Sequence, residues 1–334
     1  RLETFEAYAD QITPETVFAA FKEYALGLDN PLIRFQGRTA PEGGEAELRE
    51  AFAEGMALPI SAPEETGPLV FGYTDFGEPG TVVSDETGEA LGIRRITFAN
   101  GVRLNLKKTD IREDRISVSV AVDGGSLMAN KEDPLATYLA GSLTAGGLGK
   151  HSQDEMSTIL AGRAVSFGFG GGTEAFSMGG STTPRDLELQ LQVMTATLTD
   201  PGYRQEGVER FRQGIDNFFE TLESTPGRAL STKLGGELSD GDPRFTLQPK
   251  EAFEALDFAK LQSVIGDRLA KGAIEIGIVG DLDEEATIAA VASTLGALPP
   301  READFLPRED ARIRTFTDDR STRTITHEGE ADQA

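Results

Sequence analysis

The sequence predicts an α+β domain, in which helices pack on a mainly antiparallel sheet of six strands. Three observations predict it. Alternating segments at 93–99 and 102–107 flank Asn100-Gly101, a dipeptide typical of two-residue hairpins. A third alternating segment, 116–122, stops at Gly124-Gly125. Several segments with helical spacing of apolar residues then follow. Hairpin-connected strands grouped with helices indicate two packed layers.

The remaining elements follow from local patterns. Between residues 134 and 182 we expect two helices and then two strands, at 134–143, 153–160, 164–169 and 174–181. Further along, apolar stripes at helical spacing predict helices over 184–198, 206–222, 229–238, 252–269 and 284–295. The apolar run at 273–279 predicts a sixth strand.

Partial domains are predicted on both sides of residues 93–301. Residues 1–56 indicate the end of an α/β domain, with helices from Thr13-Pro14 and over 45–56 and a strand at 32–36. Residues 57–92 are rich in proline and glycine and predict an interdomain linker. Residues 302–334, with strands at 312–316 and 322–327, indicate the start of a further domain. We expect the chain to be a piece of a longer protein.

Composition excludes several classes of function. The net charge of −24 argues against nucleic acid or an anionic membrane surface as the partner, since both are bound by clustered Lys and Arg. No apolar run approaches the roughly 20 residues of a membrane-spanning helix. The chain has no cysteine, which excludes disulfides and thiolate metal ligands.

Two glycine-rich motifs invite a binding interpretation. The run 146–150 resembles a phosphate loop, but Thr144 and His151 stand where that motif needs glycine and Ser or Thr. It also follows a helix rather than a strand, so we expect a flexible break between helices. The triplet 170–172 predicts a loose hairpin turn, or alternatively room for a peptide to approach the backbone.

Metal and serine chemistry both lack a required residue. The only histidines, His151 and His327, have no second histidine four residues on, and we expect both at the surface. No Gly-x-Ser-x-Gly elbow occurs, because the sequence at Ser181 lacks the final glycine.

Several segments together resemble the insulinase/pitrilysin (M16) family of zinc metallopeptidases. The resemblance spans essentially the whole chain, and its specificity comes from the order of individually weak motifs. They are FANGVRLNLKK at 98–108, Gly124-Gly125-Ser126, Leu160-Ala161-Gly162, LTDP at 198–201 with Glu209-Arg210 in the next helix, IVGDL at 278–282 and HEGEADQA at the end.

The resemblance implies that this segment lacks the family's zinc site. Active members carry His-x-x-Glu-His on the first helix, where two histidines bind zinc and the glutamate is the general base. The corresponding positions here are Thr137, Ala140 and Gly141, none of which is a ligand or a base. Asp216 or Glu220 falls near the place of the third ligand and is expected to be solvated. We therefore expect no catalytic residue and no metal in this segment, with Zn²⁺ in an N-terminal half.

The implied function is the non-catalytic half of a zinc metalloendopeptidase. Residues 57–92 then join the two halves, 93–301 form a complete domain without the zinc motif, and the flanks belong to the domains before and after it. The segment would help to enclose peptide substrates beside the N-terminal half of the same chain or a homologous subunit. Its substrate-facing residues would be Val165, Phe167 and Phe169.

Two rival interpretations stay open. One is an inactive scaffold or partner subunit of the same fold, and the other is an α+β domain with an unrelated ligand. The terminal HEGEADQA resembles the start of the last domain in the bacterial members with two halves. That subgroup implies the periplasm or cell envelope as the location. A His-x-x-Glu-His motif upstream or in a neighbouring gene would separate the peptidase from the scaffold.

Overall fold

The computed structural model describes residues 8–9, 11–24, 31–37, 39–59 and 69–330. The chain divides into two compact units, Arg1–Gly67 and Pro68–Ala334, which are considered separately. The first unit contains α2 (Pro14–Tyr24) and α3 (Gly44–Ala57). The helix predicted from Thr13-Pro14 is confirmed, and Thr13 caps it, because the Thr16 backbone N–H donates to Thr13 Oγ1 at 3.3 Å. Residues 32–36 form no strand, so that prediction was wrong.

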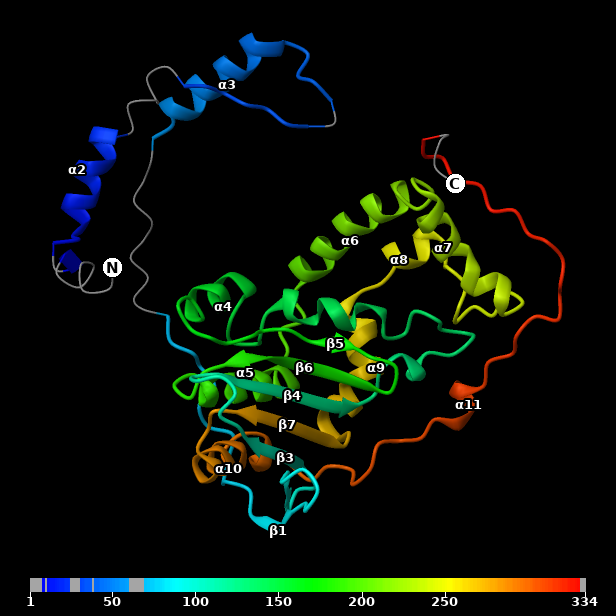
Figure 1. Ribbon diagram of the computed structural model, residues 1–334. Helices are drawn as coiled ribbons and strands as arrows, with labels where there is room; N and C mark the ends of the chain where they lie inside the picture. Colours follow the sequence, from blue (N-terminus) through cyan, green and yellow to red (C-terminus); the bar gives the residue numbers. More distant parts are fainter. Residues whose placement is uncertain (1–7, 10, 25–30, 38, 60–68, 331–334) are drawn as a thin grey trace. The chain divides into compact units, whose positions relative to one another are not determined.

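The second unit is built on one sheet (Figure 1), and the predicted α+β class is confirmed. Within the described residues its strands lie in the order β1-β2-β3-β7-β4-β6-β5, seven rather than the six expected. All neighbours are antiparallel except β3 and β7, which are parallel. The strands are β1 (Val82–Thr87), β2 (Arg94–Phe98), β3 (Arg103–Lys108), β4 (Ile116–Asp123), β5 (Gly170–Gly171), β6 (Ala175–Thr182) and β7 (Ile274–Gly280).

The predicted hairpin at Asn100-Gly101 joins β2 and β3. Gly101 has a φ of 92°, a conformation that favours glycine. The Asn100 side-chain N–H groups donate to the carbonyls of Leu295 and Leu298, both at 3.0 Å. The hairpin is therefore also fastened to η4 (Leu295–Ala297).

One face of the sheet is covered by helices, as the alternating burial along β4 shows. Val118 and Val120 are buried, whereas Ser117 and Ser119 are exposed on the opposite face. An antiparallel sheet can leave one face to solvent in this way. The covering layer in Figure 1 consists of α5 (Leu187–Thr199), α9 (Phe258–Lys271) and α10 (Glu284–Ala292).

A second group of helices lies beyond the β5 edge of the sheet (Figure 1). The region predicted as a helix over 134–143 is instead the 3₁₀ helix η3 (Tyr138–Gly146). The helix predicted over 252–269 is broken in two, because Asp257 caps α9 by accepting from the Lys260 N–H at 2.7 Å. The group also contains η2 (Ser126–Met128), α4 (Gln153–Ile159), α6 (Gln205–Glu220), α7 (Pro226–Leu238) and α8 (Lys250–Glu254).

The strand predicted over 164–169 does not form. Its backbone bonds to side chains of the α5 region instead of to a strand. The N–H of Ala164 donates to Asp186 Oδ2 at 2.8 Å, and the N–H of Ser166 donates to Gln190 Oε1 at 2.7 Å. Consequently β5 is only two residues long.

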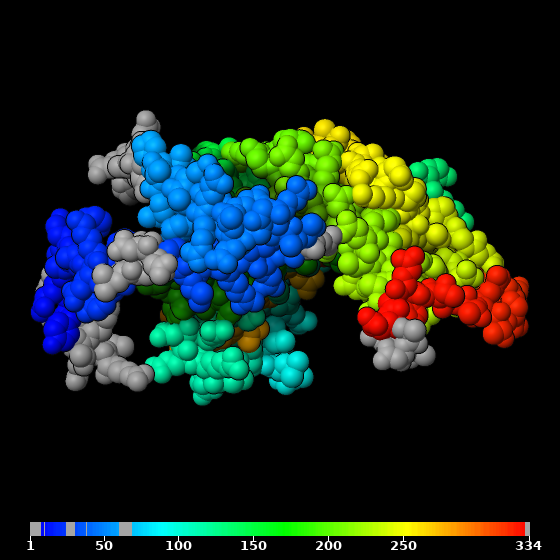
Figure 2. Space-filling model, turned by 90° about the horizontal axis from the view of Figure 1, so that it is seen from above, coloured from blue at the N-terminus to red at the C-terminus, as the bar shows by residue number. Residues whose placement is uncertain are grey.

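Two flanking predictions also need correction. The predicted linker at 57–92 includes β1 and the buried side chains of Phe71 and Tyr73, so its second part packs within the second unit. The strands predicted at 312–316 and 322–327 are absent from the described residues, which there contain α11 (Glu309–Arg312) and irregular chain. That irregular chain runs beside α7, red against yellow-green in Figure 2, and the Thr317 N–H donates to the Leu238 carbonyl at 2.9 Å.

Candidate functional site

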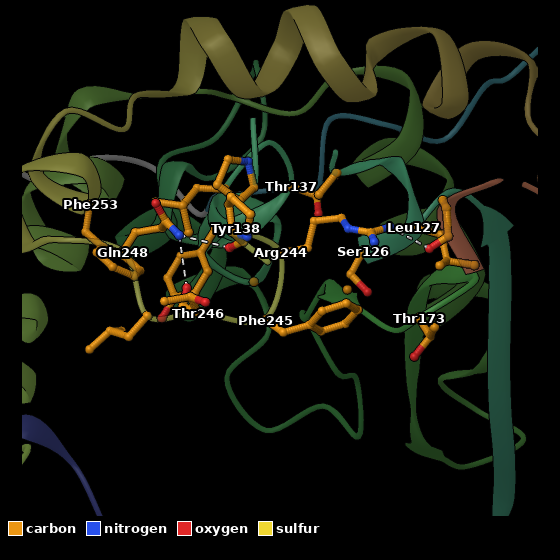
Figure 3. A pocket seen from close by; sticks show the side chains of 18 of the residues that line it. Ser126, Leu127, Thr137, Tyr138, Thr173, Arg244, Phe245, Thr246, Gln248 and Phe253 are labelled. Carbon is orange, nitrogen blue, oxygen red and sulfur yellow. Dashed lines mark hydrogen bonds between the residues drawn. The ribbon is translucent and has the colours of Figure 1, made fainter. Parts of the chain in front are cut away.

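A cavity of about 850 Å³ lies where η2, η3, the turn after β5, α7 and the loop 243–248 meet. Figure 3 shows Tyr138 and Phe253 on one side and Leu127 and Thr173 on the other, with Phe245 between them. The full lining is Ser126, Leu127, Ala129, Pro134, Leu135, Thr137, Tyr138, Gly141, Gly171, Thr173, Phe218, Ser231, Thr232, Pro243, Arg244, Phe245, Thr246, Leu247, Gln248, Phe253 and Ala311.

The cavity lies at the positions expected from the sequence to correspond to the zinc motif. Thr137 and Gly141 line it, and Ala140 is fully buried beneath it. A Cβ atom placed on Gly171 of β5 would lie 3.9 Å from the Ala140 Cβ, so η3 and β5 are in contact here. A hydroxyl, a methyl group and a glycine do not fit a zinc ion, because they offer no imidazole or carboxylate ligand.

The open edge of the sheet borders this cavity. In an antiparallel pair, residues alternate between bonding the neighbouring strand and pointing away from it. The Gly172 N–H donates to the Ala175 carbonyl at 2.8 Å, so Gly172 points toward β6 and Gly171 points away from it. Within the described part of the chain, no strand pairs with β5 on its outer side. The N–H and carbonyl of Gly171 are therefore presented at an edge that another strand could join.

Aromatic rings build one wall of the cavity. Tyr138 meets Phe253 edge to face, with ring centroids 4.9 Å apart, and Phe253 in turn packs on Phe219 at 5.5 Å. Burial raises the pKa of Tyr138, because the phenolate would lose solvation there. Its hydroxyl is thus an uncharged donor at neutral pH.

Arg244 is the one charged side chain among the lining residues, and its charge is compensated. Its guanidinium donates to both carboxylate oxygens of Asp242, at 3.0 and 2.7 Å. The Arg244 guanidinium holds the pKa of Asp242 well below its usual range. Arg244 also donates to the carbonyls of Ala311 and Ile313, at 3.0 and 2.9 Å, and so ties α11 to the rim of the cavity.

The residues expected to face substrate lie away from the cavity. Phe169 is 5% exposed and stacks on Phe176 with ring centroids 5.3 Å apart, so its side chain belongs to the core and the prediction for it was wrong. Val165 and Phe167 are partly buried and pack against the cluster that contains Phe71. Whether these two contact a peptide stays a prediction.

His151 is not the surface residue expected from the sequence. It is 8% exposed, its ring stacks on Phe71 at 5.8 Å, and its Nε2 accepts from the Gly72 N–H at 2.8 Å. His327 is half-buried, and its Nδ1 accepts from the Gly329 N–H at 3.1 Å. Neither histidine lines the cavity.

The candidate third-ligand positions lie on α6 outside the cavity lining. Asp216 is exposed and pairs with Lys250 at 2.5 Å, and Glu220 lies one turn further on. A search of the described residues finds no group of three His, Cys, Asp or Glu placed to hold a metal ion. It also finds no helix long and apolar enough to cross a membrane.

Comparison with known proteins gives the fold and distant relatives. No family model matches the chain. Its sequence is 23% identical over 225 residues to the chloroplast stromal processing peptidase of Arabidopsis thaliana and 24% identical over 213 residues to that of Pisum sativum. These alignments cover 66% and 62% of the chain but only 18% and 17% of the relatives, so the chain spans less than a fifth of their length.

Three solved structures resemble the chain at low identity. The periplasmic protease PqqL of Escherichia coli has a TM-score of 0.63 and 14% identity, over 93% of this chain and 34% of that one. The ferredoxin protease FusC, bound to Arabidopsis ferredoxin, has a TM-score of 0.61 and 14% identity, over 89% of this chain and 33% of that one. A peptidase M16 inactive domain from Pseudomonas fluorescens has a TM-score of 0.54 and 18% identity, over 65% of this chain and 53% of that one. The resemblance to M16 peptidases is therefore confirmed, and the chain has the fold of their domains.

Proposed function

We propose that this chain is a non-catalytic half of a two-half zinc metallopeptidase, and that it holds extended peptide while a separate half supplies the zinc. One observation carries the proposal. The cavity at the zinc-motif positions has lost ligands and base, at Thr137, Ala140 and Gly141, but keeps the open edge of β5 beside it. The likeness to an M16 inactive domain supports it.

The chain's own contribution is binding and orientation. An extended peptide can add to an exposed sheet edge through main-chain hydrogen bonds. Gly171 offers one N–H and one carbonyl to such a peptide, and the glycine triplet 170–172 puts no side chain in its way. No step of the hydrolysis is assigned to this half, and the domain limits 1–56, 57–92, 93–301 and 302–334 remain part of the proposal.

The substrate, metal and location belong to the same proposal. Peptides are the proposed substrate class, and the net charge of −24 favours basic or extended ones. Zn²⁺ is proposed for the N-terminal half of the same chain or for a homologous subunit. The bacterial periplasm or cell envelope is the proposed location, supported by the likeness to periplasmic PqqL.

Metal analysis combined with a hydrolysis assay tests this proposal on the purified chain. We expect well below one zinc per chain after dialysis against zinc-containing buffer, and no cleavage of a quenched fluorescent peptide. The absence of ligands at Thr137, Ala140 and Gly141 is the physical reason. Stoichiometric zinc, together with cleavage that a chelator abolishes, would contradict the assignment.

An inactive scaffold or partner subunit is the second candidate. This candidate is favoured by Ala140, which stands at the proposed position of the general base and is fully buried. A packed methyl group there is a larger change than the loss of metal ligands alone. The two candidates differ in whether the complete protein or its partner carries His-x-x-Glu-His. If neither carries it, the scaffold function replaces the peptidase function.

A further inference from the structure

We infer that the cavity beside β5 is a specificity pocket, which accepts one large apolar side chain of an extended peptide and rejects charged ones. The inference rests on the proposed function, since it concerns the same bound peptide. It adds the chemical class of the residue that is selected.

The cavity lies on the side of the sheet edge toward which a paired peptide would point a side chain. Directly opposite residues of antiparallel strands point their side chains to the same face of the sheet. A side chain on Gly171 would point toward Ala140 of η3. A peptide residue paired opposite Gly171 therefore sends its side chain to the η3 side, where Thr137, Tyr138 and Gly141 line the cavity.

The walls of the cavity carry the second step. They contain four aromatic rings together with leucine and proline side chains. A volume of about 850 Å³ is large enough for any single side chain and lies in the range of small-ligand pockets. Burying a Leu or Phe side chain against such walls removes apolar surface from water, which is the dominant source of favourable free energy in association. The apolar side chains of the lining that are larger than alanine are Leu127, Pro134, Leu135, Tyr138, Phe218, Pro243, Phe245, Leu247 and Phe253.

The polar groups of the cavity carry the third step, because they are already occupied or uncharged. Arg244 is neutralised by Asp242 and bonded to two carbonyls. The Gln248 amide donates to the carbonyls of Pro243 and Thr246, at 2.9 and 3.0 Å. The other polar lining groups are hydroxyls and main-chain atoms. A carboxylate or ammonium group entering the cavity would lose its water without gaining an uncompensated opposite charge among the lining residues.

Fluorescence anisotropy with a guest peptide series tests the inference on the whole 334-residue chain. The probe is a fluorescein-labelled host peptide of alternating Ser and Thr, with a central guest residue that is Phe, Leu, Ala, Asp or Lys. We expect the Phe and Leu guests to bind about ten- to a hundredfold more tightly than Asp and Lys. This is the factor expected for near-complete burial of one such side chain.

A cavity-filling variant locates the preference. A Cβ on Gly141 would meet no atom within 4 Å, so Gly141→Leu starts without a clash at its Cβ and extends into the cavity that Gly141 lines. It should reduce the preference for Phe and Leu to less than about threefold while the Ala guest binds as before. Gly266→Leu on α9 is the matched control, since Gly266 also has open space at its Cβ but does not line the cavity. It should keep the full preference.

The outcomes separate this inference from the function on which it rests. Equal binding of all guests overturns the apolar pocket and leaves peptide binding intact. A preference that survives Gly141→Leu places the selecting site elsewhere and overturns the location. Binding of no guest at all contradicts both the pocket and the proposed role of the β5 edge.

Discussion

Asp186 decides the path of the chain next to the sheet edge. Its carboxylate is fully buried, and it accepts from Arg163 Nε at 2.6 Å, from Arg185 Nη2 at 3.0 Å and from the Ala164 N–H at 2.8 Å. Arg185, and then the hydrogen bonds from Ala164 and Arg163, hold the pKa of Asp186 well below its usual range. The Asp186 carboxylate thus accepts from the Ala164 N–H, which in a strand would donate to the neighbouring strand.

Substitution of that carboxylate should destabilise the fold in a pH-dependent way. Asp186→Asn removes charge-assisted hydrogen bonds, and we expect a loss of about 1–3 kcal/mol in the free energy of unfolding at pH 7. Because the folded-state pKa is lowered, this stabilisation is present above the ordinary Asp pKa of about 4 and is lost as pH falls through the folded-state pKa. Urea unfolding of the wild type and the variant at several pH values measures it.

An exposed carboxylate provides the control for this experiment. The Asp304 side chain is 90% exposed and, among the described residues, pairs with Arg103, so Asp304→Asn should change stability by less than about 0.5 kcal/mol. A difference between wild type and Asp186→Asn that stays constant from pH 7 to pH 2 would show that the charge of Asp186 is not the cause.

At the scale of elements, the glycine-rich loop 146–151 is held by hydrogen bonds from Arg204, whereas a flexible break between helices was expected from the sequence. Arg204 donates to the carbonyls of Gly146 at 2.9 Å, Gly149 at 2.8 Å and His151 at 3.0 Å. A Cβ on Gly149 would lie 2.2 Å from the Asp200 carboxylate, so a larger residue there would have to displace that side chain. His151 at the end of the loop then anchors the backbone at Gly72.

Removing the acceptor on His151 should loosen that anchored segment. His151→Phe keeps an aromatic ring on Phe71 but leaves the Gly72 N–H without its partner. We expect amide hydrogen exchange over 69–73 to become at least about tenfold faster, because local opening no longer breaks this bond. His151→Gln, which can still accept, should restore part of the protection. Unchanged exchange in His151→Phe would mean that ring packing alone holds the segment.

Element prediction succeeded where a local pattern decides the structure. The Asn100-Gly101 hairpin, the alternation of β4 and the apolar stripe of α6 are each readable within a few residues. It failed over 164–169, where side chains from the α5 region outcompete strand pairing, and over 134–143, where a 3₁₀ helix replaces an α-helix. The outcome over 164–169 depends on the side chains of Asp186 and Gln190, which the local propensity of that segment does not contain.

At the scale of the whole molecule, the sheet could be anticipated in class but not in full topology. The parallel contact of β3 with β7 joins Arg103 to Glu275 across most of the domain, and nothing in either strand specifies it. The cavity is harder still to foresee, because its lining comes from segments around residues 126, 137, 171, 244 and 311. The local signal in the sequence was the glycine triplet 170–172, which left room for a peptide to approach the backbone. The absence of zinc ligands at Thr137, Ala140 and Gly141, by contrast, is visible in the sequence itself.

Hydrogen exchange of the chain with and without the Phe-guest peptide tests most directly whether this half holds extended peptide at its sheet edge. The Gly171 N–H points away from β6, so pairing with a peptide should slow its exchange. We predict protection over 168–173, and weaker protection over 243–248 where the cavity is covered. Peptide binding with protection confined to other segments, or with none over 168–173, would contradict the account.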